Sequence, residues 1–177
     1  MRRSVKILVA ATLVAVSTGA LAVQPGFEKM RFQDWRIMIK EAHLAYERGK
    51  FDRAVELYTR NACAGDKSSQ FALGTMYLLG EGTKPDALRA LAWYASAAES
   101  NYGDYVKARD KLDGMIPAEH RAAADAMKQQ TLAEYGAKAT HVSCKLRAEV
   151  GTKIAALECK PPIDARTSFV EAKMCTE

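Results

Sequence analysis

The fold of this chain is decided by the sequence FALGTMYLLGEG at residues 71–82, followed by DALRALAWYASAA at residues 86–98. The first part spaces its apolar side chains three and four residues apart, the pattern of one buried helix face. Gly80 and Gly82 then allow the left-handed backbone that ends a helix and reverses the chain. Asp86 suits the N-cap of a second helix, where its carboxylate accepts a bond from a free N–H group. The two segments therefore predict an antiparallel helical hairpin.

The pattern of the second helix occurs earlier in the chain as well. Ala90, Tyr94 and Ala98 recur every four residues and form one ridge of small, large and small side chains. The residues 36 positions before them are Ala54, Tyr58 and Ala62. Self-similarity with a period of about 30–40 residues is typical of an array in which each unit buries its apolar face on the next.

The second hairpin resembles the Sel-one-like repeat, a longer-turned relative of the tetratricopeptide repeat. The residues that carry the resemblance are Leu73, Gly74, Tyr77, Gly80, Gly82, Asp86, Ala90, Trp93, Tyr94, Ala97 and Ala98. The earlier unit, Gly49-Lys50-Phe51-Asp52 followed by Ala54, is more similar to the tetratricopeptide repeat itself. The resemblance implies an all-α solenoid that binds proteins or peptides, usually as a scaffold without catalysis.

We expect an all-α fold, a short solenoid of antiparallel helical hairpins, over residues 23–136. The first repeat is expected at about residues 34–65, the second at about 68–101 and a pair of capping helices at about 104–136. Residues 23–31 are expected to be a loose leader, and residues 140–177 a cysteine-containing tail with a β-hairpin.

The N-terminus has the three regions of a secretory signal peptide. Basic residues stand at Arg2, Arg3 and Lys6, an apolar run follows at residues 7–16, and Ala20-Leu21-Ala22 is a small-x-small cleavage site. The apolar run is shorter than the ~20 residues that a membrane span needs. We therefore predict cleavage between Ala22 and Val23, a periplasmic or secreted protein, and no stable membrane insertion after cleavage.

Removal of this segment also changes the charge. The formal net charge of +5 falls to +2, because the segment holds three basic and no acidic residues. A balance near neutrality lacks the basic patch that nucleic acids require, so no nucleic-acid partner is expected.

Beyond residue 141 the apolar pattern changes from the helical period to alternation. Val142, Cys144 and Leu146 alternate with polar residues, and an alternating segment follows at residues 155–160. A fold at Gly151-Thr152 pairs Cys144 with Cys159, because glycine at the first central position is typical of a type II′ hairpin. This register places the cysteines at a hydrogen-bonded site, where Cα atoms lie farther apart.

The four cysteines predict two disulfides, since thiols are oxidised in exported proteins. The hairpin favours Cys144–Cys159, which leaves Cys63–Cys175 to tie the end of the tail to the first repeat. The alternative joins Cys159 to Cys175 and Cys63 to Cys144.

Three classes of function remain open on the sequence alone. The leading one is a non-catalytic interaction module that presents a helical-repeat surface to a protein or peptide of unknown identity. The second is a β-lactam-binding or hydrolysing enzyme, as linked to cysteine-rich members of the resembled family. That class pairs cysteines within each repeat, and Cys63 has no such neighbour. The third is a structural component of an envelope assembly.

We expect no catalytic residue, cofactor or metal site. His141 and Cys144 are three residues apart but have no convincing second pair of ligands.

Overall fold

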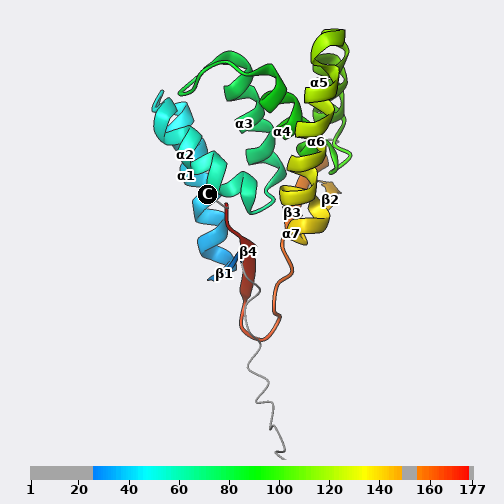
Figure 1. Cartoon of the computed structure of the whole chain (residues 1–177). Helices are drawn as coiled ribbons and strands as arrows, with labels where there is room; N and C mark the ends of the chain where they lie inside the picture. The colour runs from blue at the N-terminus through cyan, green and yellow to red at the C-terminus, as the bar shows by residue number, and fades with distance from the viewer. Residues whose placement is uncertain (1–25, 149–154, 176–177) are drawn as a thin grey trace, which may run out of the picture.

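The computed structural model describes residues 26–148 and 155–175. The predicted signal peptide, its cleavage site between Ala22 and Val23, and the turn at Gly151-Thr152 lie outside the described residues. Three helical pairs follow one another along the chain and stand side by side in Figure 1. These pairs are α1 (Phe32–Glu47) with α2 (Phe51–Cys63), α3 (Lys67–Leu79) with α4 (Ala87–Ala98), and α5 (Gly103–Met115) with α6 (Arg121–Tyr135).

The helical pairs stack on one another as predicted. α2 packs on α3, and α4 packs on both α5 and α6. α6 also touches α2, so the row of second helices, α2, α4 and α6, curves back on itself. The prediction of a short solenoid of antiparallel helical hairpins is confirmed.

Two aspartates and one glycine set the ends of the central hairpin. Asp66 caps α3 by accepting a bond from the backbone N–H of Ser69 at 2.7 Å. Asp86 caps α4 by accepting bonds from the N–H groups of Leu88 and Arg89. Gly80 ends α3 in the left-handed conformation, with φ of 74°.

The two helices of this hairpin approach closely because small side chains line their contact. A Cβ added to Gly74 would lie 2.7 Å from the ring of Tyr94 and 3.0 Å from the carbonyl oxygen of Ala90. Ala90 is fully buried, and the Tyr94 hydroxyl is hydrogen-bonded to the Thr75 hydroxyl at 3.0 Å. The small residues Gly74 and Ala90 therefore leave the space that the Tyr94 ring fills.

The second helix of the capping pair is not continuous but is flanked by two short helical segments. A 3₁₀ turn, η1 (Ala118–His120), precedes α6, and a four-residue helix, α7 (Ala137–Thr140), follows it after Gly136. Leu112, Ile116 and Ala124 bury the apolar faces of the cap against Leu91 of α4. The last hairpin thus closes the core at this end of the solenoid.

The predicted β-hairpin is present in the tail. β2 (Ser143–Ala148) pairs antiparallel with β3 (Ala155–Lys160), with Cys144 opposite Cys159 and Leu146 opposite Leu157. A disulfide joins Cys144 to Cys159, which confirms the disulfide-tied hairpin. Their Cα atoms are 4.0 Å apart, the spacing of a close, non-hydrogen-bonded pair, so the expected wide site is wrong.

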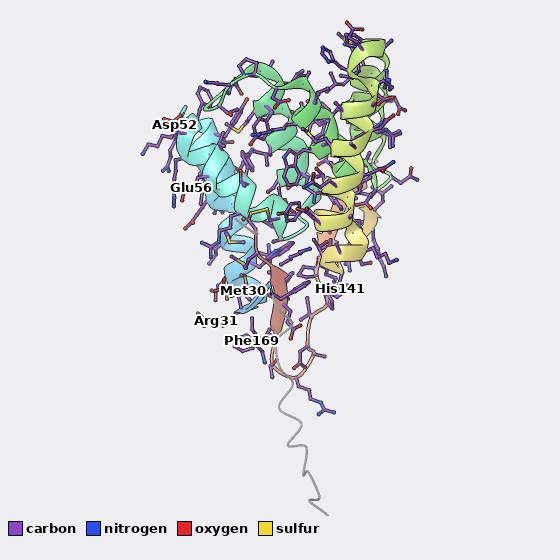
Figure 2. The ribbon with its side chains drawn as sticks, in the orientation of Figure 1. Met30, Arg31, Asp52, Glu56, His141 and Phe169 are labelled. Atoms are coloured by element: carbon purple, nitrogen blue, oxygen red, sulfur yellow. A yellow bond between two sulfur atoms is a disulfide. The ribbon has the colours of Figure 1, made fainter. Side chains whose placement is uncertain are left out.

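The prediction of a loose leader is also wrong for the described part of residues 23–31. β1 (Phe27–Arg31) pairs antiparallel with β4 (Phe169–Lys173), a strand of the tail that the sequence pattern did not reveal. Figure 2 shows Met30 and Phe169 on this small sheet, below the helices. The sheet forms because its apolar side chains bury themselves on α1: Val170 and Ala172 pack with Trp35 and Met38.

The sheet joins the two ends of the described chain. β1 stands before the first helix and β4 comes from the tail, so the tail is part of the same folded body as the first repeat. Among the described residues, no helix is both long and apolar enough to cross a membrane.

Candidate functional site: an inner groove

The second helices of the three pairs enclose a groove of about 490 Å³, which we call the inner groove. Its walls come from α2, α4 and α6, with one residue from α3 and one from the C-terminal segment. The lining residues are Thr59, Cys63, Tyr77, Arg89, Ala92, Trp93, Met127, Gln130, Thr131, Glu134, Tyr135 and Cys175. A surface shared by all three helical pairs exists only once the solenoid has formed.

Aromatic rings form much of the groove. Trp93 of α4 stacks on Tyr135 of α6, with 5.6 Å between ring centroids and 26° between ring planes. The guanidinium of Arg89 lies 5.6 Å from the ring centroid of Tyr77, within the range of a cation–π contact. Trp93 and Tyr77 are half-buried, so part of each ring remains open to a ligand.

The position of Trp93 follows from its place next to Tyr94 in the sequence. Neighbouring residues on an α-helix point about 100° apart. Tyr94 therefore enters the core between α3 and α4, where it is 5% exposed, while Trp93 faces the groove. Both residues carry the repeat resemblance, but only Tyr94 lies wholly in the core, whereas Trp93 packs partly on the core and partly lines the groove.

A buried polar network holds the groove helices together. Gln70 donates through Nε2 to the carbonyl oxygens of Ala62 and Tyr135, each at 2.9 Å. These two acceptors lie in the last turns of α2 and α6, where backbone carbonyls have no partner four residues further along the helix. One side chain of α3 thus donates a hydrogen bond to a carbonyl group of each helix and so connects α2 to α6.

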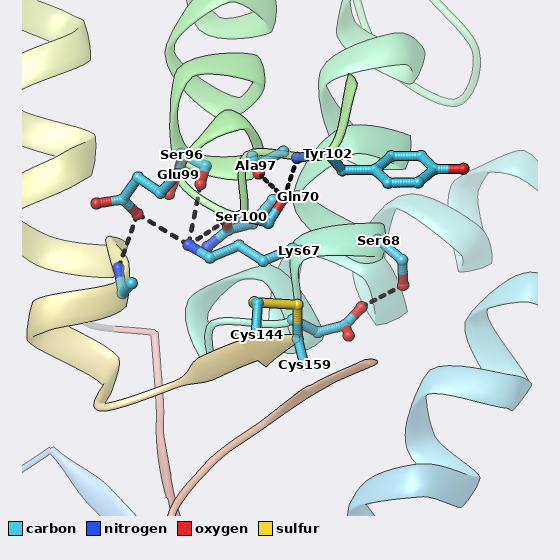
Figure 3. Close-up of a disulfide and its surroundings, with 12 residues drawn as sticks. Lys67, Ser68, Gln70, Ser96, Ala97, Glu99, Ser100, Tyr102, Cys144 and Cys159 are labelled. Carbon is cyan, nitrogen blue, oxygen red and sulfur yellow. Dashed lines mark hydrogen bonds and ion pairs between the residues drawn. A yellow bond between two sulfur atoms is a disulfide. The ribbon is translucent and has the colours of Figure 1, made fainter. Parts of the chain in front are cut away.

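The network also contains a fully buried lysine, shown in Figure 3. Lys67 donates through Nζ to Gln70 Oε1 at 3.1 Å, to the Ser96 carbonyl oxygen at 2.9 Å and to Glu99 Oε2 at 2.9 Å. Burial lowers the pKa of Lys67, and the bond to Glu99 opposes that shift. Glu99 also accepts a bond from the backbone N–H of Ala137 at 2.7 Å, which attaches the start of α7 to α4.

A disulfide lies in the groove wall. Cys63 at the end of α2 is bonded to Cys175, across a sequence separation of 112 residues. Cys63 is 2% exposed, whereas Cys175 is an exposed residue. With Cys144–Cys159, this bond leaves no free cysteine.

The other residues singled out by the sequence serve the hairpin. Gly74 and Ala90 lie in the packed contact of the repeat, Ala98 is buried on the side of α4 that faces α5 and α6, and Gly80 and Asp86 lie at the turn of the hairpin. Gly82 has φ of 67°, and a Cβ there would lie 2.5 Å from the carbonyl carbon of Phe51, so it also seats this turn on the first repeat. Tyr77 and Trp93 are the two that line the groove.

Sequence reasoning missed Lys67, Gln70 and Tyr135. A signal was present at one of them: a lysine in the first turn of a helix opposes the helix dipole, which points to a special partner. In the described part of the chain, no group of three or more His, Cys, Asp or Glu side chains is placed to hold a metal ion.

The comparisons with known proteins agree with the central hairpin. The family model of the Sel1 repeat matches residues 67–102, which contain α3 and α4, so the predicted repeat is confirmed there. Sel1 repeats generally mediate protein–protein interaction. No curated protein matches the chain.

Among solved structures, a protective antigen of uropathogenic Escherichia coli that displays an SLR fold is similar to this chain at 21% sequence identity and a TM-score of 0.47. The match covers 58% of this chain and 23% of the antigen, so the chain corresponds to less than a quarter of that protein.

Proposed function

We propose that this protein is an exported, non-catalytic interaction module that binds an extended peptide segment of a partner protein in the inner groove. The observation that carries the proposal is the groove itself, which has a volume of about 490 Å³ and is lined by residues of all three helical pairs. Its volume falls within the roughly 300–1,000 Å³ typical of ligand sites.

The chemistry of the groove suits a peptide. The open parts of Trp93 and Tyr77 offer flat apolar surface for a ligand side chain, and aromatic residues dominate the binding energy of protein interfaces. Gln130 and Thr131 add hydrogen-bonding groups that can pair with a peptide backbone. Arg89 and Glu134 bring one charge of each sign, so the groove favours a mixed rather than a strongly charged peptide.

The location forms part of the same proposal. Two disulfides support an oxidising compartment, because thiols stay reduced in the bacterial cytoplasm. Residues 1–22 then act as a cleaved signal peptide and the exported chain begins at Val23. N-terminal sequencing of periplasmic material checks this, and an intact Met1 would contradict it.

A photo-crosslinking experiment tests the groove. A benzophenone amino acid replaces Gln130 in the groove, and in a matched variant it replaces Lys107, an exposed residue of α5 outside the groove. We expect the Gln130 variant to crosslink one envelope protein, and a synthetic peptide of the crosslinked segment to bind the purified protein. Trp93→Ala should abolish that binding, whereas Met115→Ala, at a residue 68% exposed on the cap, should leave it unchanged. Equal crosslinking from both positions would contradict the proposal.

The two alternatives are separated by simple measurements. Hydrolysis of nitrocefin by the purified protein would favour the β-lactam-directed enzyme. Copurification in a fixed stoichiometry with a large envelope complex would favour a structural component of an assembly.

A further inference from the structure

The C-terminal segment Lys173–Cys175 crosses from α6 to α2, and we call it the strap. At one end, Lys173 donates through Nζ to the carbonyl oxygen of Glu134 and lies 5.5 Å from the ring centroid of Tyr135. At the other end, Cys175 is bonded to Cys63 of α2. Figure 1 shows the last described residues after β4 running toward α2.

The strap joins parts of the solenoid that ordinary repeat packing connects weakly. In a solenoid each repeat contacts chiefly its neighbours, so the distance between the first and last pairs is set by small rotations that add up along the array. Here a covalent bond at Cys175 and a hydrogen bond at Lys173, two residues earlier, connect the first pair to the last. The strap therefore adds a covalent tie between α2 and α6 to the link that Gln70 makes, and it closes one end of the inner groove.

The strap also occupies part of the groove. Cys63 and Cys175 both line it, and Lys173 covers one side of Tyr135, whose ring also stacks on Trp93. A ligand at this end meets the protein's own chain.

The two disulfides differ in their accessibility to an external thiol. Cys175 is exposed, whereas Cys144 and Cys159 are both half-buried residues of the hairpin. Thiol–disulfide exchange requires a thiolate to reach one sulfur in line with the bond, so its rate depends on access. In Cys63–Cys175 an exposed residue is bonded to a buried one, so an external thiol reaches this disulfide from the side of Cys175.

We propose that Cys63–Cys175 is a redox-sensitive closure of the inner groove: an external dithiol reductant opens the strap and frees one end of the groove. The thiolate of the reductant attacks the sulfur of Cys175, the Cys63–Cys175 bond breaks, and Cys63 leaves as a thiolate that takes up a proton. The second thiolate of the reductant then attacks the mixed disulfide and releases Cys175. Two protein cysteines are reduced and one dithiol is oxidised to its disulfide.

Opening of the strap leaves the surrounding structure in place. β4 stays paired with β1, and its apolar side chains remain buried on α1. What is lost is the covalent tie to α2, so Cys175 can leave the groove wall and that end of the groove becomes accessible, while Gln70 still joins α2 to α6. Only the use of this opening in peptide binding rests on the proposed function.

Differential alkylation tests the access argument on the full exported protein. The protein is exposed to dithiothreitol for increasing times, its free thiols are alkylated, and each cysteine is quantified by mass spectrometry. We expect Cys63 and Cys175 to become alkylated about ten-fold faster than Cys144 and Cys159, because only Cys175 is exposed. Equal rates, or faster reduction of Cys144–Cys159, would overturn the proposal.

Tryptophan quenching by acrylamide tests the effect on the groove. The chain holds two tryptophans, and Trp35 is 3% exposed, so quenching reports mainly on Trp93. We expect the quenching constant to rise about two-fold in C63S/C175S, since a half-buried ring becomes exposed, and to stay at the wild-type value in C144S/C159S. An unchanged constant in C63S/C175S would overturn the proposal.

A second variant keeps the disulfide and lengthens the strap. Two glycines inserted after Met174 give slack without removing the bond, so this variant retains the covalent tie even if C63S/C175S does not fold. We expect its Trp93 quenching to rise above the wild-type value, and a wild-type value would count against the strap. Neither the alkylation nor the quenching measurement uses a peptide ligand, so their outcomes do not depend on the result of the crosslinking experiment above.

Discussion

At the scale of single residues, two glycines with nearly the same backbone conformation have different tasks. Gly49 and Gly82 have φ of 68° and 67°. A Cβ on Gly49 would meet no atom within 4 Å, whereas a Cβ on Gly82 would lie 2.5 Å from the Phe51 carbonyl carbon and oxygen. Gly49 is thus required only for its left-handed backbone, whereas Gly82 is required both for its left-handed backbone and for the close approach of the turn to the backbone of Phe51.

This difference gives the first prediction. Gly49→Ala should lower the free energy of unfolding by about 1 kcal/mol, the cost of a left-handed residue with a Cβ. Gly82→Ala should cost about 2–4 kcal/mol, because backbone atoms of Phe51 must also move. Urea unfolding of both variants measures the difference. Equal losses would show that the turn does not rest on the first repeat.

Lys67 gives a second prediction at this scale. Lys67→Ala should lower the free energy of unfolding by about 3 kcal/mol, because Glu99, the Ser96 carbonyl and Gln70 each lose a buried donor. Lys84→Ala is the matched control, since Lys84 is exposed in the turn. Chemical denaturation should find the control within about 0.5 kcal/mol of the wild type. A loss as small as that for Lys67→Ala would refute the structural role of the network.

At the scale of elements, the α3–α4 contact depends on the absence of one methyl group. Gly74→Ala should lower the free energy of unfolding by about 1–3 kcal/mol, because the added Cβ would lie 2.7 Å from the Tyr94 ring. Gly114→Ala is a matched change inside α5, where a Cβ would meet nothing within 4 Å. That substitution should stabilise the protein by about 0.5–1 kcal/mol through helix propensity. Thermal melts of the pair should therefore shift in opposite directions, and shifts of the same sign would contradict the assigned contact.

The cap has its own dependence on pH. The hydrogen bond from Lys128 holds the pKa of Asp113 below its usual value, with further help from Arg121. Because the folded-state pKa is depressed, the stabilisation is fully present above the unfolded pKa, near 4, and is lost as the pH falls through the folded value.

Asp113→Asn should therefore destabilise the protein at pH 7 by roughly 0.5–1 kcal/mol, since the pair is partly exposed, and by less at pH 2. Asp104→Asn is the control, because Asp104 is an exposed carboxylate of the same helix and its Oδ1 lies 3.8 Å from Lys107 Nζ. This substitution should change the free energy of unfolding little at either pH. Denaturation of the variants at the two pH values decides the point. The prediction fails if the effect of Asp113→Asn is the same at both.

At the scale of the whole molecule, the two disulfides close loops of very different length. The sequence separation is 112 residues for Cys63–Cys175 and 15 for Cys144–Cys159. In the chain-entropy model such loops stabilise the native state by about 4–5 and about 3 kcal/mol. C63S/C175S should therefore lose more free energy of unfolding than C144S/C159S, and both should keep their helical circular dichroism, because the two apolar clusters that pack the helices together contain no cysteine. A larger loss in C144S/C159S would contradict this.

The sequence by itself determined the helical hairpins, the central repeat and the pairing of β2 with β3. Those features depend on residues close in the chain: the spacing of Ala90, Tyr94 and Ala98, the glycine turn, and the alternation on either side of Gly151. Local periodicity carries such information because an element's buried face repeats with its backbone.

Only the tertiary structure decided the β1–β4 sheet, the Lys67 network and the inner groove. β1 and β4 are too short to show a pattern, and they pair across the whole chain because burial on Trp35 stabilises them. Trp93 and Tyr135 are far apart in the sequence and stack because α4 and α6 pack. The groove is a relation between helices, and helical periodicity indicates which face of a helix is buried but not which side chain of another helix meets it.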